Sequence, residues 1–121
     1  MKRWFIKKLN KGLLEEMDKI NIGKKALYKY KRYVGDNYNE TDKRALSKLK
    51  RNFLVGEHIH TNNDSTFTVR YGNLYISGVS YKGDGTVEIN EIHNQRGKCT
   101  KFTINNKLKN KIDKLIEMEI I

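Results

Sequence analysis

Three histidines are the side chains in this 121-residue sequence best suited to acid–base chemistry. His58 and His60 lie two residues apart in a strand-like stretch, and on a regular strand such residues project from one face. Imidazole titrates near neutral pH, so one ring could accept a proton from a ribose 2′-hydroxyl while another protonates the leaving oxygen. Together with His93 and the cation of Arg70, these residues could form the centre of a small metal-independent RNase.

A metal site is the weaker interpretation of the same histidines. It would need a third ligand beside His58 and His60, and the His-x-His spacing often arises by chance on polar strands. The single cysteine, Cys99, excludes an internal disulfide and disfavours a cysteine-based zinc site. We therefore expect no metal, no cofactor and, in the leading interpretation, no catalytic residues, with the cytoplasm as compartment.

Positive charge is concentrated near the N-terminus. The formal net charge is +11, and the first 35 residues hold eleven Lys or Arg against three acids. Such asymmetry is typical of chains that bind a polyanion, most often nucleic acid. Trp4, Tyr30 and Tyr33 lie among the cations, and aromatic rings stack on unpaired bases, which favours RNA or single-stranded DNA. The residues predicted to bind nucleic acid are Lys7, Lys8, Lys11, Lys24, Lys25, Tyr28, Lys29, Lys31 and Arg32.

Several function classes stay open beside this one. The chain could dock on a nucleic-acid-handling protein complex as an inhibitor or accessory factor, serve as a protein–protein adaptor, or be a toxin-like RNase. No apolar run approaches the roughly 18 residues of a membrane span, and Glu15, Glu16 and Asp18 disfavour a membrane-surface helix, so we expect no membrane partner. The abundance of Lys, Asn and Ile indicates an AT-rich genome, such as that of a phage or mobile element. The sequence gives no indication of oligomeric state.

Helical periodicity characterises both ends of the chain. Apolar residues recur every three or four positions there, and Leu27, Tyr30 and Val34 would share one side of a helix. Gly35 suits a C-terminal cap, and Asn39 or Thr41 can cap the next helix at its N-terminus. The predicted helices cover about 3–20, 24–34 and 41–52, with a last helix around 108–116.

Between these helices the apolar period changes to two, which indicates strands. Gly72-Asn73 between two alternating segments is the clearest hairpin signal. The five predicted strands cover 53–61, 65–71, 74–82, 86–93 and 99–104. The expected fold is α+β: N-terminal helices, a five-stranded antiparallel meander that forms a bent sheet or small barrel, and a C-terminal helix. Its parts would be a basic helical region, 1–52, and a sheet with the final helix, 53–121, in one compact domain.

Overall fold

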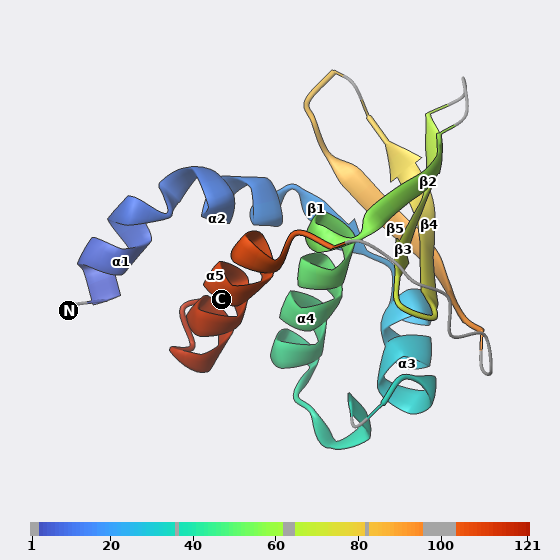
Figure 1. The fold of residues 1–121 in the computed structure, drawn as a ribbon, viewed down its shortest axis with the longest axis horizontal. Helices are drawn as coiled ribbons and strands as arrows, with labels where there is room; N and C mark the ends of the chain where they lie inside the picture. The colour runs from blue at the N-terminus through green and yellow to red at the C-terminus, as the bar shows by residue number, and fades with distance from the viewer. Residues whose placement is uncertain (1–2, 36, 62–64, 82, 96–103) are drawn as a thin grey trace.

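A computed structural model describes residues 3–35, 37–61, 65–81, 83–95 and 104–121, with the backbone alone for His60 and Thr61. Within these ranges the chain forms helices and one mixed sheet, so the fold is α+β (Figure 1). The helices are α1 (Arg3–Leu9), α2 (Lys11–Asp18), α3 (Lys24–Tyr33), α4 (Asp42–Val55) and α5 (Asn106–Glu117), with a short 3-10 helix, η1 (Asn37–Asn39). The strands are β1 (Ile20–Ile22), β2 (Glu57–Thr61), β3 (Thr66–Tyr71), β4 (Leu74–Ser80) and β5 (Val87–Asn94).

The sheet is mixed and open, with strand order β1-β5-β4-β3-β2. Strands β2 to β5 form the predicted antiparallel meander, but β1 pairs with β5 in parallel, from Ile20 opposite Val87 to Ile22 opposite Ile89. The expectation of a purely antiparallel sheet was therefore wrong, and so was the small barrel. Strand β1 has three residues, which are too few to show a period of two. The sequence analysis therefore placed Ile20 at the end of the preceding helix. The predicted strand 99–104 falls, up to residue 103, outside the described residues.

The β3–β4 hairpin confirms the strongest turn signal. Tyr71 pairs with Leu74 around Gly72-Asn73, and Gly72 has a φ of 63°, which glycine adopts without steric cost. One strand further on, the β4–β5 register shifts at Ser77 and Gly78. A Cβ atom on Gly78 would lie 1.9 Å from the Glu88 carbonyl oxygen, so only glycine permits this close approach.

Two helix boundaries differ from the expectation. The predicted helix over 3–20 is interrupted at Asn10, where the backbone N–H and the side-chain Nδ2 both donate to the Ile6 carbonyl. At the other boundary, α4 continues to Val55, so the strand expected to begin at residue 53 begins at Glu57. The burial of Leu49, Asn52 and Val55, three residues apart, shows helical packing where the sequence was interpreted as alternation.

The predicted caps are present. The Thr41 hydroxyl accepts a hydrogen bond from the Arg44 N–H at 3.2 Å and so begins α4. Gly35 has a φ of 54° directly after Val34, where α3 ends.

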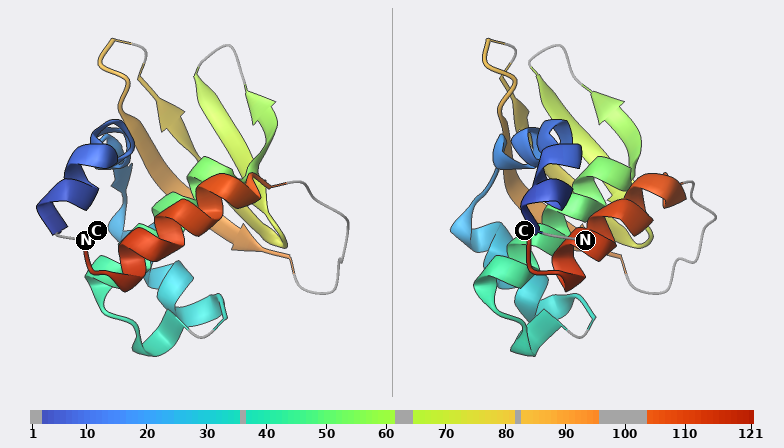
Figure 2. Two further views of the ribbon diagram at one scale, coloured as in Figure 1. Left: turned by 60° about the vertical axis from the view of Figure 1, so that its left-hand side comes forward. Right: turned by 90° about the vertical axis from the view of Figure 1, so that its left-hand side faces the viewer.

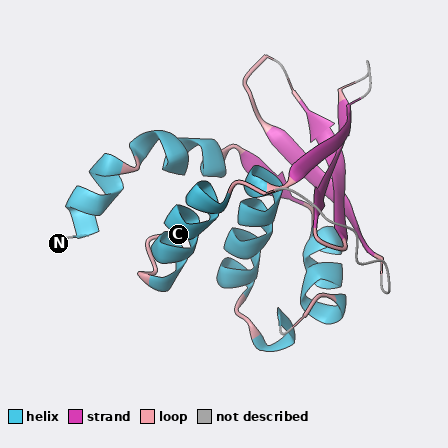
Figure 3. Cartoon of the chain, viewed as in Figure 1, coloured by secondary structure: helices cyan, strands magenta, loops and turns pink. Residues whose placement is uncertain are grey.

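The helices lie on one side of the sheet and form two further layers (Figures 2 and 3). Ala26 and Tyr30 of α3 and Leu49 of α4 pack against a buried sheet face that includes Val69 and Ile76. A second apolar cluster joins α2, α4 and α5 through Met17, Val55, Ile112 and Ile116. The layer order is therefore sheet, then α3 with α4, then α5 with α2, and α3 and α1 are at opposite sides of the molecule (Figure 1).

Candidate nucleic-acid interface

Helix α3 is held along the edge of β5 and turns a basic, aromatic stripe outward. The Gly23 N–H donates to the Ile89 carbonyl at 2.9 Å, and the Asn94 side chain donates to the Tyr33 carbonyl at 3.2 Å. As predicted, Leu27, Tyr30 and Val34 face the core. Tyr30 is therefore buried, and the expectation that its ring stacks on a base was wrong. Lys24, Tyr28 and Arg32, spaced by four, form the exposed stripe.

Arg32 is the centre of a cluster of exposed tyrosines. Its guanidinium carbon lies 5.9 Å from the Tyr28 ring centroid and 5.8 Å from that of Tyr33, both within cation–π range. The pKa of Arg32 is raised from its ordinary value, first by the neighbouring Tyr28 phenol and then by Tyr33. The side chains of Tyr28, Tyr33 and Tyr38 are 58%, 50% and 68% exposed, so the protein itself leaves much of each ring uncovered.

A surface groove of about 510 Å³ lies between α3 and the segment that contains η1. Tyr28 and Tyr38 both line it, with the cations of Lys24 and Arg32 beside them. Its remaining lining residues are Leu27, Lys31 and Asp42. We refer to Lys24, Tyr28, Arg32, Tyr33 and Tyr38 as the Tyr–Arg surface. Sequence analysis missed Tyr38, because no local pattern shows that the turn after α3 brings this residue back to the helix.

Three of the predicted cations on or beside this surface already have carboxylate partners. Lys25 lies 3.3 Å from Glu91, Lys29 donates to the other oxygen of that carboxylate, and Lys31 lies 2.7 Å from Asp42. The hydrogen bond from Lys29, followed by that from Lys25, lowers the pKa of Glu91 below its usual value. Lys24, in contrast, has no ion-pair partner in the part of the chain that the structure describes.

The other predicted cations, Lys7, Lys8 and Lys11, belong to a different surface. They are exposed on α1 and α2, and Lys11 lies 4.0 Å from Glu15. Helix α4 lies between these two helices and α3 (Figure 1). The structure therefore divides the predicted nucleic-acid-binding residues into two groups rather than one continuous surface.

The residues of the alternative RNase site are dispersed over the sheet. His58 is on the edge strand β2 and His93 on β5, with β3 and β4 between them, so their backbones are separated by three strand spacings, or roughly 14 Å. Arg70 and His93 lie in one row across the sheet, on either side of Tyr75, whereas His58 lies in the neighbouring row opposite Val69. Adjacent rows project from opposite faces, so one phosphate would not contact both histidines.

The backbone register of His58 and His60 also differs from that of a regular strand. A bulge at Ile59 places His58 opposite Val69 and His60 opposite Thr68, which are consecutive residues of β3. The His58 ring instead packs edge to face against Phe53, with 6.3 Å between ring centroids. The side chain of His60 lies outside the described residues.

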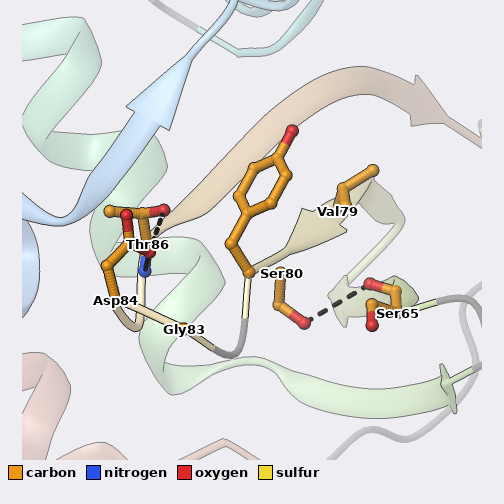
Figure 4. A pocket seen from close by; sticks show the side chains of 7 residues that line it. Ser65, Val79, Ser80, Gly83, Asp84 and Thr86 are labelled. Carbon is orange, nitrogen blue, oxygen red and sulfur yellow. Dashed lines mark hydrogen bonds between the residues drawn. The ribbon is translucent and has the colours of Figure 1, made fainter.

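A second hollow lies at the β4–β5 turn, where Ser65, Ser80, Tyr81 and Asp84 line it (Figure 4). Asp84 accepts hydrogen bonds from the Thr86 N–H at 3.0 Å and hydroxyl at 2.7 Å, and these bonds lower its pKa. The carboxylate is thus engaged in closing its own turn, and no histidine or cation is among the residues that line this hollow.

Among the described residues, no group of three His, Cys, Asp or Glu side chains is placed to hold a metal ion. Across the same ranges, no helix combines the length and apolar character that crossing a membrane requires. Comparison with protein-family models, curated proteins and solved structures finds no match to this chain.

Proposed function

We propose that the protein binds single-stranded nucleic acid through the Tyr–Arg surface. The observation that carries this proposal is the arrangement of Arg32 between the rings of Tyr28 and Tyr33, all at the molecular surface, with Tyr38 across the groove. Exposed aromatic rings provide stacking faces for any unpaired base, and neighbouring cations bind the phosphates.

The unpaired state of the ligand follows from the geometry of stacking. Bases within a duplex already stack on one another and offer only their edges to a protein. Rings as exposed as those of Tyr28 and Tyr38 are therefore useful chiefly for bases that are splayed out. Overall net charge of +11 adds long-range attraction to any polyanion, but the tyrosines supply the preference for single strands.

Fluorescence anisotropy with a labelled single-stranded oligonucleotide and its duplex tests the proposal. We expect tighter binding of the single strand, with an affinity that falls as salt rises. Arg32→Ala should weaken binding and reduce the salt slope by about 0.7, the value for one lost phosphate contact to a single strand. Lys107→Ala, which removes an exposed cation from α5, is the matched control and should change neither. Equal effects of the two substitutions would contradict the proposed surface.

A further inference from the structure

Helix α1 leaves much of its apolar surface uncovered. Trp4, Phe5 and Leu9 are 62%, 40% and 63% exposed, and no residue of α1 is buried. A hydrogen bond joins α1 to the C-terminal segment, which Arg3 donates to the Glu119 carbonyl at 2.8 Å. Clustered apolar side chains on the surface of a folded protein mark a face that another molecule covers.

A groove of about 490 Å³ runs between α1 and α5. Its lining residues are Ile6 and Leu9 from α1, Asn10 between α1 and α2, and Lys111, Lys114, Leu115 and Met118 from the C-terminal end of the chain. On each side the residues follow helical spacing, with steps of three and four, so each wall is one face of a helix. A third helix fits between two such ridged walls, as in helix-in-groove recognition.

The charge around the groove defines the chemistry of its occupant. Lys111 and Lys114 are exposed at its edge, and neither has an ion-pair partner within the described ranges. Lys7 and Lys8 add two exposed cations on α1. A second copy of this chain would bring the same cations against these, and like charges at an interface oppose association. An occupant with carboxylates beside an apolar stripe complements both the walls and the edge.

We propose that the groove between α1 and α5 binds an acidic amphipathic helix of a partner protein. The apolar stripe of that helix contacts Ile6, Leu9 and Met118, and its carboxylates pair with Lys111 and Lys114. Most of the Tyr–Arg surface belongs to α3, on the opposite side of the molecule from α1 (Figure 1). The protein would thus join a partner protein to a nucleic acid, and this binding does not depend on the nucleic-acid proposal.

Peptide binding provides a direct test. The probe is a synthetic, fluorescently labelled helical peptide with Leu at positions i, i+3, i+4 and i+7 and Glu at the flanking positions, to which the full chain is added. Trp4 is not among the residues that line the groove, so the readout is the anisotropy of the labelled peptide. We expect saturable binding. Lys114→Glu should weaken binding at least about tenfold, a change well above measurement error.

Two further variants separate the groove from general charge effects. Leu9→Ser removes an exposed apolar side chain. It should also weaken the binding of the peptide, without a change in the thermal unfolding temperature. Lys107→Glu changes the net charge as much as Lys114→Glu does, but Lys107 does not line the groove, so it should leave peptide binding intact.

Four results would overturn the inference. The first is no saturable signal below about 1 mM protein, and the second is equal binding of a peptide with Lys in place of Glu. The third is binding of the protein to anionic phosphatidylglycerol vesicles and none to the peptide. The fourth is a concentration-dependent dimer in sedimentation that Leu9→Ser disrupts.

Discussion

Two of the lysines predicted to bind nucleic acid, Lys25 and Lys29, form ion pairs with the carboxylate of Glu91. Replacing this acid, in Glu91→Gln, leaves Lys25 and Lys29 without their ion pair and adds one unit of positive charge next to the Tyr–Arg surface. We expect tighter binding of a single-stranded oligonucleotide and a salt slope steeper by about 0.7 for each lysine that reaches a phosphate. Anisotropy titrations at several salt concentrations measure both quantities.

The matched control for that substitution is Glu88→Gln on the same strand. Glu88 accepts a hydrogen bond from Tyr81, near the turn between β4 and β5, and does not pair with α3. Glu88→Gln changes the net charge as much as Glu91→Gln does, but it should leave the salt slope unchanged. If both variants strengthened binding alike, general charge rather than the lysines of α3 would account for the effect.

Tyr30 shows how closely a core residue and a ligand-binding residue can alternate on one helix. Its hydroxyl accepts a hydrogen bond from the buried Asn52 side chain at 3.3 Å, and burial raises its pKa. Tyr30→Phe leaves the Asn52 amide without this acceptor, so we expect the free energy of unfolding to fall by about 1–3 kcal/mol. Tyr33→Phe, on the exposed side of α3, should alter it by less than about 0.5 kcal/mol. Urea denaturation measures both variants, and equal stabilities would contradict this role of Tyr30.

At the scale of elements, Asp113 joins α4 to α5. It accepts from Arg51 at 2.7 Å and Lys109 at 2.8 Å. Burial tends to raise the pKa of this carboxyl, but the hydrogen bonds from Lys109 and Arg51 outweigh that effect and the pKa is lowered. A lowered folded-state pKa gives stability that is present above the unfolded value, about 3.9, and is lost as the pH falls through the folded value.

Asp113→Asn should therefore lower the free energy of unfolding at pH 7 by about 1 kcal/mol, a modest amount because solvent partly screens the pair. As the pH falls from 7 through the lowered folded-state pKa, the difference from the wild type should shrink, since the wild-type carboxyl becomes protonated as well. Urea denaturation at pH 7 and at acidic pH measures the difference. A constant difference at both would show that the charge of Asp113 is not the stabilising feature.

The register shift at Gly78 depends on the close approach of β4 and β5. Gly78→Ala would place a methyl group against the Glu88 carbonyl, and we expect the free energy of unfolding to fall by at least about 2 kcal/mol. Gly83→Ala is the control, because a Cβ there meets nothing within 4 Å. Comparable losses in the two variants, measured by thermal unfolding, would argue against the close contact.

The elements also show what the sequence could and could not reveal. The Gly72-Asn73 turn and the Thr41 cap were predictable because their signals lie within a few residues. Strand β1 was not, since its state depends on pairing with Val87–Ile89, more than sixty residues away. For the same reason the bulge at Ile59, which separates the rows of His58 and His60, was invisible in their spacing.

The candidate interface was only partly predictable for a related reason. Helical spacing was sufficient to separate Lys24, Tyr28 and Arg32 from the buried stripe of Tyr30. The pairing of Lys25 and Lys29 with Glu91 and the return of Tyr38 to the groove are long-range contacts that no local pattern encodes.

At the scale of the whole molecule, the N-terminal charge is divided between two separate surfaces. The Tyr–Arg surface lies on α3 and η1, and the cations of α1 lie on the opposite side, beside α5 (Figure 1). Between them the helices pack on the sheet face opposite the row that contains Arg70 and His93. We therefore propose that ligands bind to the helical layers and that the sheet supports these helices.

The most direct test of the central claim is the affinity for a single-stranded oligonucleotide after the exposed rings are removed. We predict that the double variant Tyr28→Ala, Tyr38→Ala weakens binding about tenfold or more, the loss expected when stacking on at least one base is removed. The control Tyr81→Ala removes a similarly exposed ring from the β4–β5 turn and should leave the affinity unchanged. Unchanged affinity in the double variant, or an equal loss in the control, would contradict binding at the Tyr–Arg surface.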